Sequence, residues 1–215
     1  MRDNEYLLYK IENNVAVITL NQPDTMNAIG PDFAQTLNEA IEYASNEANA
    51  IVLLGSERAF SAGANLKGAR FQDDSAEMDL GINLENVYNP FLDKLVNLPI
   101  PLIVGVRGAA AGIGCSIALM GDIIVAGKSA YFLQAFTRIG LIPDAGGSYF
   151  LPRKIGLAKS IGAAFFAEKI SAKEASLIGL IWECVNDELF ASQWTKRAVY
   201  LANGPTQAFI RAKKA

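Results

Sequence analysis

Apolar and polar residues alternate near the start of the chain in a way that predicts a β-hairpin. The segments YLLYKIE and VAVITLN are rich in β-branched and aromatic residues and flank the turn pair Asn13-Asn14. The spacing then becomes helical after Pro31, which suits the first position of a helix. Five apolar residues of the next segment recur at this spacing: Phe33, Leu37, Ala40, Ile41 and Ala44. We therefore expect a hairpin followed by an amphipathic helix.

Short, almost wholly apolar runs in the middle of the chain predict buried strands of a parallel sheet. They are AIVLLGS (50–56), PLIVGVRG (101–108) and DIIVAG (122–127). The segment FSAGANLKG follows the first run as a Gly/Ala-rich turn, and the second leads into a Gly/Ala helix from 112. The polar run 69–80 predicts a loop before a helix over about 81–97.

The second half of the chain continues this order of strands and helices. A short strand is predicted at AYFLQ and another at IWECVN, with mostly helical sequence from 147 onward. Strands that alternate with helices indicate an α/β layered fold. No linker divides the sequence, so we expect one domain over 1–215.

Composition narrows the class of protein and its partners. The 215 residues are 51% hydrophobic and carry a formal net charge of -3, which leaves no basic excess for a nucleic-acid partner. Residues 108–121 form the most apolar stretch, which is shorter than the ~20 residues of a membrane-spanning helix. The two cysteines form no CxxC pair and the N-terminus has no apolar leader, so we expect a cytoplasmic protein without a membrane partner.

The absence of histidine excludes several kinds of catalytic site. The sequence contains no His, so neither a Ser-His-Asp nor a Cys-His system can form, and imidazole-based zinc sites are ruled out. We expect no metal site. Acid–base chemistry must fall to Asp, Glu, Lys, Tyr or Cys.

Two segments, VLLGSERAFSAGANLKG and IVGVRGAAAGIGCSIALMGD, share a strand, a Gly/Ala-rich corner and a helix start. Such corners expose backbone N–H groups that can bind a negatively charged oxygen, so the pair could form one oxyanion hole. The alternative is that the small residues serve only close packing. A dinucleotide site is disfavoured, because Ile117 stands where the third glycine of GxGxxG belongs.

Four co-linear segments carry a family resemblance over essentially the whole chain. ERAFSAGANLKG, GAAAGIGCSIALMGDIIVAG, GLIPDAGGSYFLPRKIG and ISAKEASLIGLIWECVND together resemble the enoyl-CoA hydratase/isomerase (crotonase) superfamily. The resemblance implies a crotonase-like (ClpP/crotonase) spiral of β-β-α units that acts on acyl-CoA thioesters. It also implies a homotrimer or hexamer, no cofactor beyond the CoA of the substrate, and a C-terminal helical region from about 187 that is shortened here.

The same resemblance assigns roles by position. The backbone N–H groups of Ala64 and Ile113 would form the oxyanion hole. Five neighbours would bind the substrate or its CoA: Ala62, Gly63, Asn65, Leu66 and Lys67. Lys67 is equally well explained as a solvated lysine at a helix start.

Departures from the family pattern point to one reaction. Ser116 and Phe136 occupy the positions of the two hydratase glutamates, which leaves Asp144 of GLIPDAGG as the candidate acid/base. This segment resembles the PaaG-like isomerases, so we expect a double-bond shift through a dienolate in fatty acid or phenylacetate catabolism. The alternatives are a hydratase, another lyase or thioesterase of the superfamily, or a non-catalytic acyl-CoA-binding protein. From composition alone, Asp144 could instead be a turn former or a helix cap.

Overall fold

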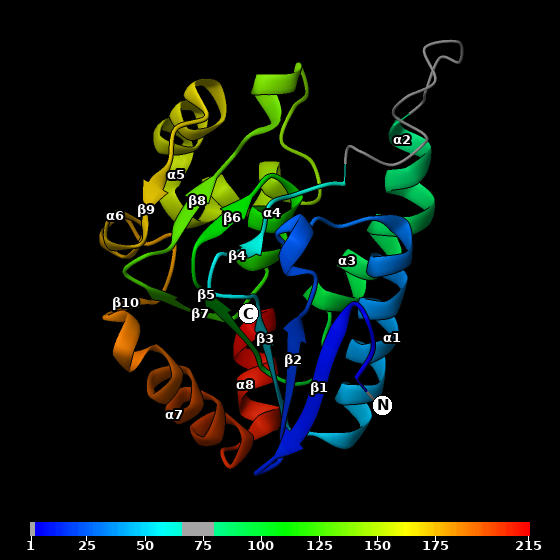
Figure 1. Ribbon diagram of the computed structural model, residues 1–215. Helices are drawn as coiled ribbons and strands as arrows, with labels where there is room; N and C mark the ends of the chain where they lie inside the picture. The colour runs from blue at the N-terminus through cyan, green and yellow to red at the C-terminus, as the bar shows by residue number, and fades with distance from the viewer. Residues whose placement is uncertain (1–2, 66–79) are drawn as a thin grey trace.

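The computed structural model describes residues 3–65 and 80–215, which form an α/β arrangement of two sheets and surrounding helices (Figure 1). The predicted hairpin is confirmed as β1 (Leu7–Glu12) paired antiparallel with β2 (Val15–Leu20). Asn13 and Asn14 have φ values of 52° and 61°. Positive φ at both turn residues matches the twist of the two strands, and Asn tolerates it well.

The larger sheet contains six strands in the order β1-β2-β3-β5-β7-β10. Every pairing beyond the hairpin is parallel. The remaining strands are β3 (Ala50–Leu54), β5 (Leu102–Val106), β7 (Ile123–Gly127) and β10 (Glu183–Val185). All five residues of β5 are buried, as expected for a strand covered on both faces.

The smaller sheet contains short strands in the order β4-β6-β8-β9. They are β4 (Ala59–Ser61), β6 (Ala109–Ala111), β8 (Tyr131–Leu133) and β9 (Ile170–Ser171). β4, β6 and β8 pair in parallel, and each comes directly after a strand of the larger sheet. The chain therefore passes from the larger sheet to the smaller one three times, and after each of these passages it continues toward a helix.

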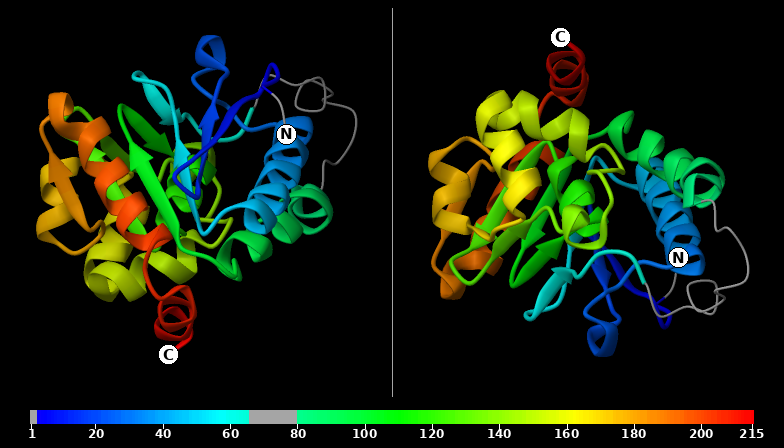
Figure 2. Two further views of the ribbon diagram at one scale, coloured as in Figure 1. Left: turned by 90° about the horizontal axis from the view of Figure 1, so that it is seen from below. Right: turned by 90° about the horizontal axis from the view of Figure 1, so that it is seen from above.

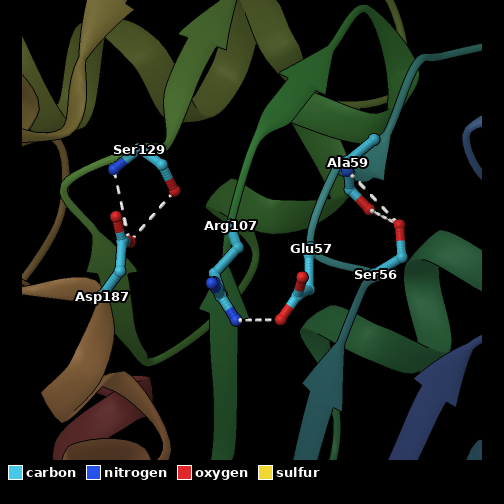
Figure 3. Close-up of polar contacts among 6 residues, drawn as sticks. All are labelled: Ser56, Glu57, Ala59, Arg107, Ser129 and Asp187. Atoms are coloured by element: carbon cyan, nitrogen blue, oxygen red, sulfur yellow. Dashed lines mark hydrogen bonds and ion pairs between the residues drawn. The ribbon is translucent and has the colours of Figure 1, made fainter.

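The turns between the two sheets are joined by polar contacts (Figure 3). Arg107, after β5, pairs with Glu57, after β3, with 2.9 Å between Nη1 and Oε1. Ser129, after β7, donates from N and Oγ to Oδ1 of Asp187, at 3.3 and 3.0 Å. Ser56 Oγ bonds the carbonyl of Ala59 at 3.1 Å. The Arg107–Glu57 and Ser129–Asp187 contacts are exposed and contribute little energy singly, whereas the Ser56–Ala59 bond is partly buried.

Helices cover both faces of the larger sheet. Their bounds are α1 (Pro31–Glu47), α2 (Leu80–Asn83), α3 (Asn89–Val96), α4 (Ile113–Leu119), α5 (Gly147–Phe166), α6 (Ala172–Leu177), α7 (Phe190–Ala202) and α8 (Thr206–Lys214). A π-helix, Leu84–Tyr88, joins α2 to α3. Ile51 and Leu53 of β3 belong to the main core with α1, whereas Val52 packs into a second cluster with residues of α7. Alternate side chains of one strand thus fill two different layers.

The C-terminal helix α8 extends away from the two sheets (Figure 2). Near its end, Lys213 Nζ pairs with Asp122 Oδ1 at 2.9 Å. A cavity of about 610 Å³ opens beside α8 and is lined by Met120, Phe150 and Phe209 among others. No described helix combines the length and apolar character needed to cross a membrane.

The structure corrects the sequence-based description at several points. FSAGANLKG is not simply a turn, because Phe60 and Ser61 belong to β4. PLIVGVRG does not lead directly into a helix, because β6 intervenes before α4. The strands are short, and their pairing partners lie far away in the sequence, so no local pattern marks them. The loop predicted over 69–80 lies, apart from Leu80, outside the described residues.

Candidate active site

The first Gly/Ala corner follows β4 and is held against the segment after β2. The Ile29 N–H donates to the Gly63 carbonyl at 2.8 Å, and the Asn65 N–H donates to the Ile29 carbonyl at 3.0 Å. This parallel bridge uses the groups on either side of Ala64. The N–H of Ala64 donates to no described carbonyl, and the residue is exposed. Ala64 therefore presents a backbone donor at the surface of the corner.

The second corner follows β6 and opens α4. Gly112 has φ 51° and ψ -129°, a conformation that side chains disfavour. Its own N–H bonds the Leu133 carbonyl at 2.9 Å, which anchors the corner to β8. Ile113 is the first residue of α4, so its N–H has no acceptor within the helix. The corner thus offers a second backbone donor.

The two corners are in direct contact. A Cβ placed on Gly112 would lie 3.8 Å from the Cα of Gly63, and one placed on Gly63 would lie 3.1 Å from the Ala111 carbonyl oxygen. This close approach follows from the parallel pairing of β4 with β6. The structure therefore brings together the two segments that the sequence suggested could cooperate.

Asp144 lies in a strained turn immediately before α5. The Gly147 N–H donates to the Asp144 carbonyl at 2.7 Å, and the two residues between them, Ala145 and Gly146, have φ values of 48° and 81°. Left-handed backbone at an alanine costs roughly 1 kcal/mol. Such strain persists only where the surrounding structure enforces it, and it is common at functional sites.

The carboxyl group of Asp144 is not a helix cap. The N-cap of α5 is Gly146, and no side chain caps that helix. Oδ1 of Asp144 is buried and accepts no hydrogen bond from a described residue. Loss of hydration raises the pKa of Asp144 to about 6. A carboxyl group with this pKa can exchange a proton near neutral pH.

The apolar residues before Asp144 differ in their burial. Phe136 is buried and its carbonyl accepts from the Leu141 N–H at 3.0 Å, so the segment around the acid folds back on itself. Ile142, two residues before the acid, is 80% exposed. It lies in the irregular segment before the turn, where nothing forces alternate residues inward.

Tyr88 faces the acid from the π-helix. Burial, followed by the charge of Asp144, raises the pKa of the Tyr88 phenol. The phenol hydroxyl donates to the Ile29 carbonyl at 3.3 Å, the same oxygen that accepts from Asn65. π-Helical turns occur frequently at functional sites. The sequence offered no local signal for Tyr88, because Ile29 and Asp144 lie in two distant segments.

Ser116 and Phe136, which the family resemblance places at the two hydratase-glutamate positions, have structural contacts. Ser116 is fully buried in α4, and its Oγ donates to the Asp144 carbonyl at 3.1 Å. Phe136 opens a short 3-10 helix, Phe136–Ile139, and is 6% exposed. Neither residue carries a carboxylate, and Ser116 links α4 to the backbone of Asp144.

The remaining predicted residues divide into two groups. Ala62 and Gly63 lie in the first corner, with Asn65 beside them, whereas Leu66 and Lys67 lie outside the described residues.

Cys115 is buried, and burial raises the pKa of its thiol to about 12, so it behaves as an apolar side chain. Among residues 3–65 and 80–215, no cluster of three or more potential metal ligands occurs. The cavity beside α8 is lined by none of Ala64, Ile113 or Asp144.

Comparison with known proteins gives a consistent result over nearly the whole chain. The sequence profile of the family described as enoyl-CoA hydratase/isomerase matches residues 10–215. A protein of Rhodobacter capsulatus named probable enoyl-CoA hydratase is 48% identical over 96% of this chain and 79% of its own length. The 1,2-epoxyphenylacetyl-CoA isomerase of Escherichia coli is 37% identical over 94% of this chain and 78% of its own length.

Solved structures agree with the sequence comparisons. A putative enoyl-CoA hydratase/isomerase from Mycobacterium abscessus superimposes with a TM-score of 0.90 at 32% identity, covering 97% of this chain and 81% of the other. A putative enoyl-CoA hydratase/carnithine racemase from Magnetospirillum magneticum gives a TM-score of 0.87 at 27% identity, covering 99% and 82%. The two-sheet arrangement described above is therefore the crotonase fold.

Proposed function

The chain belongs to the enoyl-CoA hydratase/isomerase family, and from this premise we propose that it is an isomerase that moves a double bond of an acyl-CoA thioester from the 3,4 to the 2,3 position. The observation that carries the proposal is the environment of Asp144. Its carboxyl group is partly desolvated and has a raised pKa, and its backbone carbonyl accepts a hydrogen bond from Ser116 of α4. By the family resemblance, Ser116 and Phe136 replace the two glutamates of a hydratase. One carboxylate suffices for a proton shuttle, whereas hydration in this family uses two.

In the proposed reaction, Asp144 acts first as a base and then as an acid. Its carboxylate removes a proton from Cα of the 3-enoyl thioester, and the electron pair moves onto the thioester oxygen to form a dienolate. The same carboxyl group then returns the proton to Cγ, which restores the carbonyl and leaves the double bond between Cα and Cβ. The proton balance closes, so no co-reactant is required.

Ala64 and Ile113 supply the proposed oxyanion hole. Their N–H groups would donate to the thioester oxygen, whose negative charge develops during the first proton transfer. Fixed donors of this kind are usually the largest catalytic contribution, and loss of one costs roughly 10²–10³-fold in rate. Ala62, Gly63 and Asn65, together with Leu66 and Lys67, are proposed to bind the substrate and its CoA, which needs no separate cofactor.

A second candidate is enoyl-CoA hydration, because the Rhodobacter capsulatus relative carries that name. The decisive experiment compares two rates with the same enzyme preparation. We expect conversion of 3-hexenoyl-CoA to 2-hexenoyl-CoA to be much faster than hydration of crotonyl-CoA. Comparable rates would reject the isomerase assignment in favour of hydration. Release of free CoA, detected with a thiol reagent, would instead indicate thioester hydrolysis.

The acyl group of the substrate is either a linear chain or a modified ring. The Escherichia coli relative is named for a 1,2-epoxyphenylacetyl-CoA substrate, so a ring-modified acyl group is a specific candidate beside linear chains. Assaying that thioester in parallel with 3-hexenoyl-CoA distinguishes the two classes by their kcat/KM values.

We also propose a homotrimer or hexamer in the cytoplasm. The helix α5 carries exposed apolar side chains at helical spacing, Leu157, Ile161 and Phe165, exposed by 67%, 42% and 73%. A stripe of this kind is typical of a surface that another chain covers. Sedimentation velocity tests the assembly, and a single monomeric species would contradict it.

A further inference from the structure

The segment Met26–Ile29 contains a buried polar side chain that bonds the Gln22 N–H and β4, the strand that leads into the first corner. Asn27 is completely buried and has a φ of 55°, and Met26 beside it has a φ of 52°. Two consecutive left-handed residues other than glycine are costly, so the surrounding structure must hold them in place. The hydrogen bonds of Asn27 show what enforces this conformation.

The side-chain amide of Asn27 bonds to β4, the strand that leads into the corner. Its Nδ2 donates to the carbonyl oxygens of Ala59 and Phe60, each at 3.1 Å. Its Oδ1 accepts from the Gln22 N–H at 2.7 Å. One buried amide therefore fixes both β4 and the chain that precedes the Met26–Ile29 segment.

The backbone of the same segment continues this set of contacts into the corner. The Met26 carbonyl accepts from the Ala62 N–H at 2.9 Å. The Asn27 carbonyl accepts from Ser61 Oγ at 2.8 Å, and the same Oγ accepts from the Gly63 N–H at 3.2 Å. The two Ile29 hydrogen bonds described above complete this set. Every residue from 59 to 65 except Ala64 is therefore hydrogen-bonded to the segment Met26–Ile29, either directly or through Ser61.

We propose that Asn27 is a positioning residue for the first oxyanion donor, so that it controls how strongly the Ala64 N–H polarises a bound thioester carbonyl; this role rests on the function proposed above. The Asn27 side chain is completely buried, so it cannot contact a bound substrate directly. It acts by fixing the direction of one N–H group. A donor that is displaced by a fraction of an ångström remains present but binds the developing oxyanion less well.

The test uses Asn27→Asp, which keeps the size of the side chain and its tolerance of positive φ. The substitution replaces the Nδ2 donor with an oxygen that faces the carbonyls of Ala59 and Phe60, so β4 and the corner must shift. Asn49→Asp is the matched control. Asn49 Nδ2 also donates to a backbone carbonyl, that of Ala202 at 3.1 Å, but at the other end of β3 from the corner.

The readout is the infrared stretching band of the thioester carbonyl of bound butyryl-CoA, labelled with ¹³C at that carbon. Hydrogen bonds from the oxyanion hole lower its frequency relative to free butyryl-CoA. We expect Asn27→Asp to lose a clear part of this shift and to lower kcat about 10–100-fold with KM changed less than about 3-fold. Asn49→Asp should retain both the band position and kcat.

Each outcome has a separate meaning. An unchanged band and kcat in folded Asn27→Asp, or equal losses in Asn49→Asp, would overturn the positioning role while leaving the proposed function intact. Absence of any shift with the wild-type protein would overturn the proposed oxyanion hole and the positioning role with it. If Asn27→Asp does not fold, Ser61→Ala replaces it, because that variant removes only the link from Asn27 to the Gly63 N–H. The same loss of band shift is expected, and an unchanged band would reject the proposal.

Discussion

The hydroxyl group of Ser116 donates a hydrogen bond to the backbone carbonyl of Asp144, with 3.1 Å between the two oxygen atoms. The contact ties the strained turn before α5 to the helix whose first N–H is a candidate oxyanion donor. It therefore fixes the distance between the candidate acid and the candidate hole. Ser116 therefore has a structural role at a position where the family resemblance implies a glutamate in hydratases.

Ser116→Ala should impair turnover more than stability. Removing the hydroxyl leaves the Asp144 carbonyl with the Gly147 bond alone, which costs about 1 kcal/mol of unfolding free energy. The loosened turn should lower kcat on the order of 10-fold, because small displacements of a reacting group are costly. Thermal unfolding and isomerase kinetics measure the two effects. Ser160→Ala, which removes a 2.7 Å bond to the Gly156 carbonyl, should cost similar stability without the loss of kcat.

Asp144→Asn should abolish proton transfer while preserving binding. The amide has nearly the same shape but cannot accept a proton, so kcat should fall roughly 10²–10⁴-fold. Calorimetric titration with butyryl-CoA should give a dissociation constant close to that of the wild type. A variant with wild-type isomerase rates would show that Asp144 is only a turn residue.

The pH dependence of kcat/KM should report the titration of Asp144. Because burial raises the pKa of this carboxyl to about 6, the active carboxylate form is lost as the pH falls through that value. We expect a tenfold loss for each pH unit below about 5 with a substrate that does not titrate there. A profile that stays flat down to about pH 4.5 would exclude Asp144 as the base.

Asp144→Asn should also stabilise the folded protein at neutral pH. The folded state binds the Asp144 proton more tightly than the unfolded state, so the free energy of unfolding falls as the pH rises from about 4 to about 6. Above that range, the folded protein carries the full cost of a buried, ionised carboxylate. Asp144→Asn removes this cost. We expect a gain on the order of 1 kcal/mol at pH 7.5, reduced by solvent screening, and almost none at pH 4. Urea unfolding at both pH values measures the difference, and an equal gain at both would argue against desolvation.

Gly114→Ala should push the two corners apart. A Cβ at this position would lie 2.6 Å from the Cβ of Ser61 and 2.8 Å from its carbonyl oxygen, so the backbone of one corner must move. We expect a loss of about 1–3 kcal/mol in stability together with reduced kcat. Gly162→Ala in α5 is the control, because no atom lies within 4 Å of its new Cβ and the helix favours alanine. It should be neutral or stabilising in urea unfolding.

Part of the fold followed from short-range patterns in the sequence. The Asn13-Asn14 hairpin, the helix that begins at Pro31 and the apolar runs that became β3, β5 and β7 each depend on neighbouring residues, whose spacing decides which face is buried. The resemblance in GLIPDAGG further singled out Asp144, and burial raises the pKa of its carboxyl group in the structure.

Only the tertiary structure decided how the site is built. β4 and β6 contain three residues each, too few for a periodic signal, and they exist because parallel neighbours complete their hydrogen bonds. The Asn27 contacts span up to 34 residues, and the Tyr88 hydroxyl donates to the carbonyl of Ile29, 59 residues away in the sequence. These long-range hydrogen bonds depend on which strands become neighbours. A buried amide such as that of Asn27 is stabilised only by the carbonyl groups that the folded chain brings close to it. Sequence spacing therefore predicted the candidate acid and the corners, whereas long-range packing determined the supports that hold them in place.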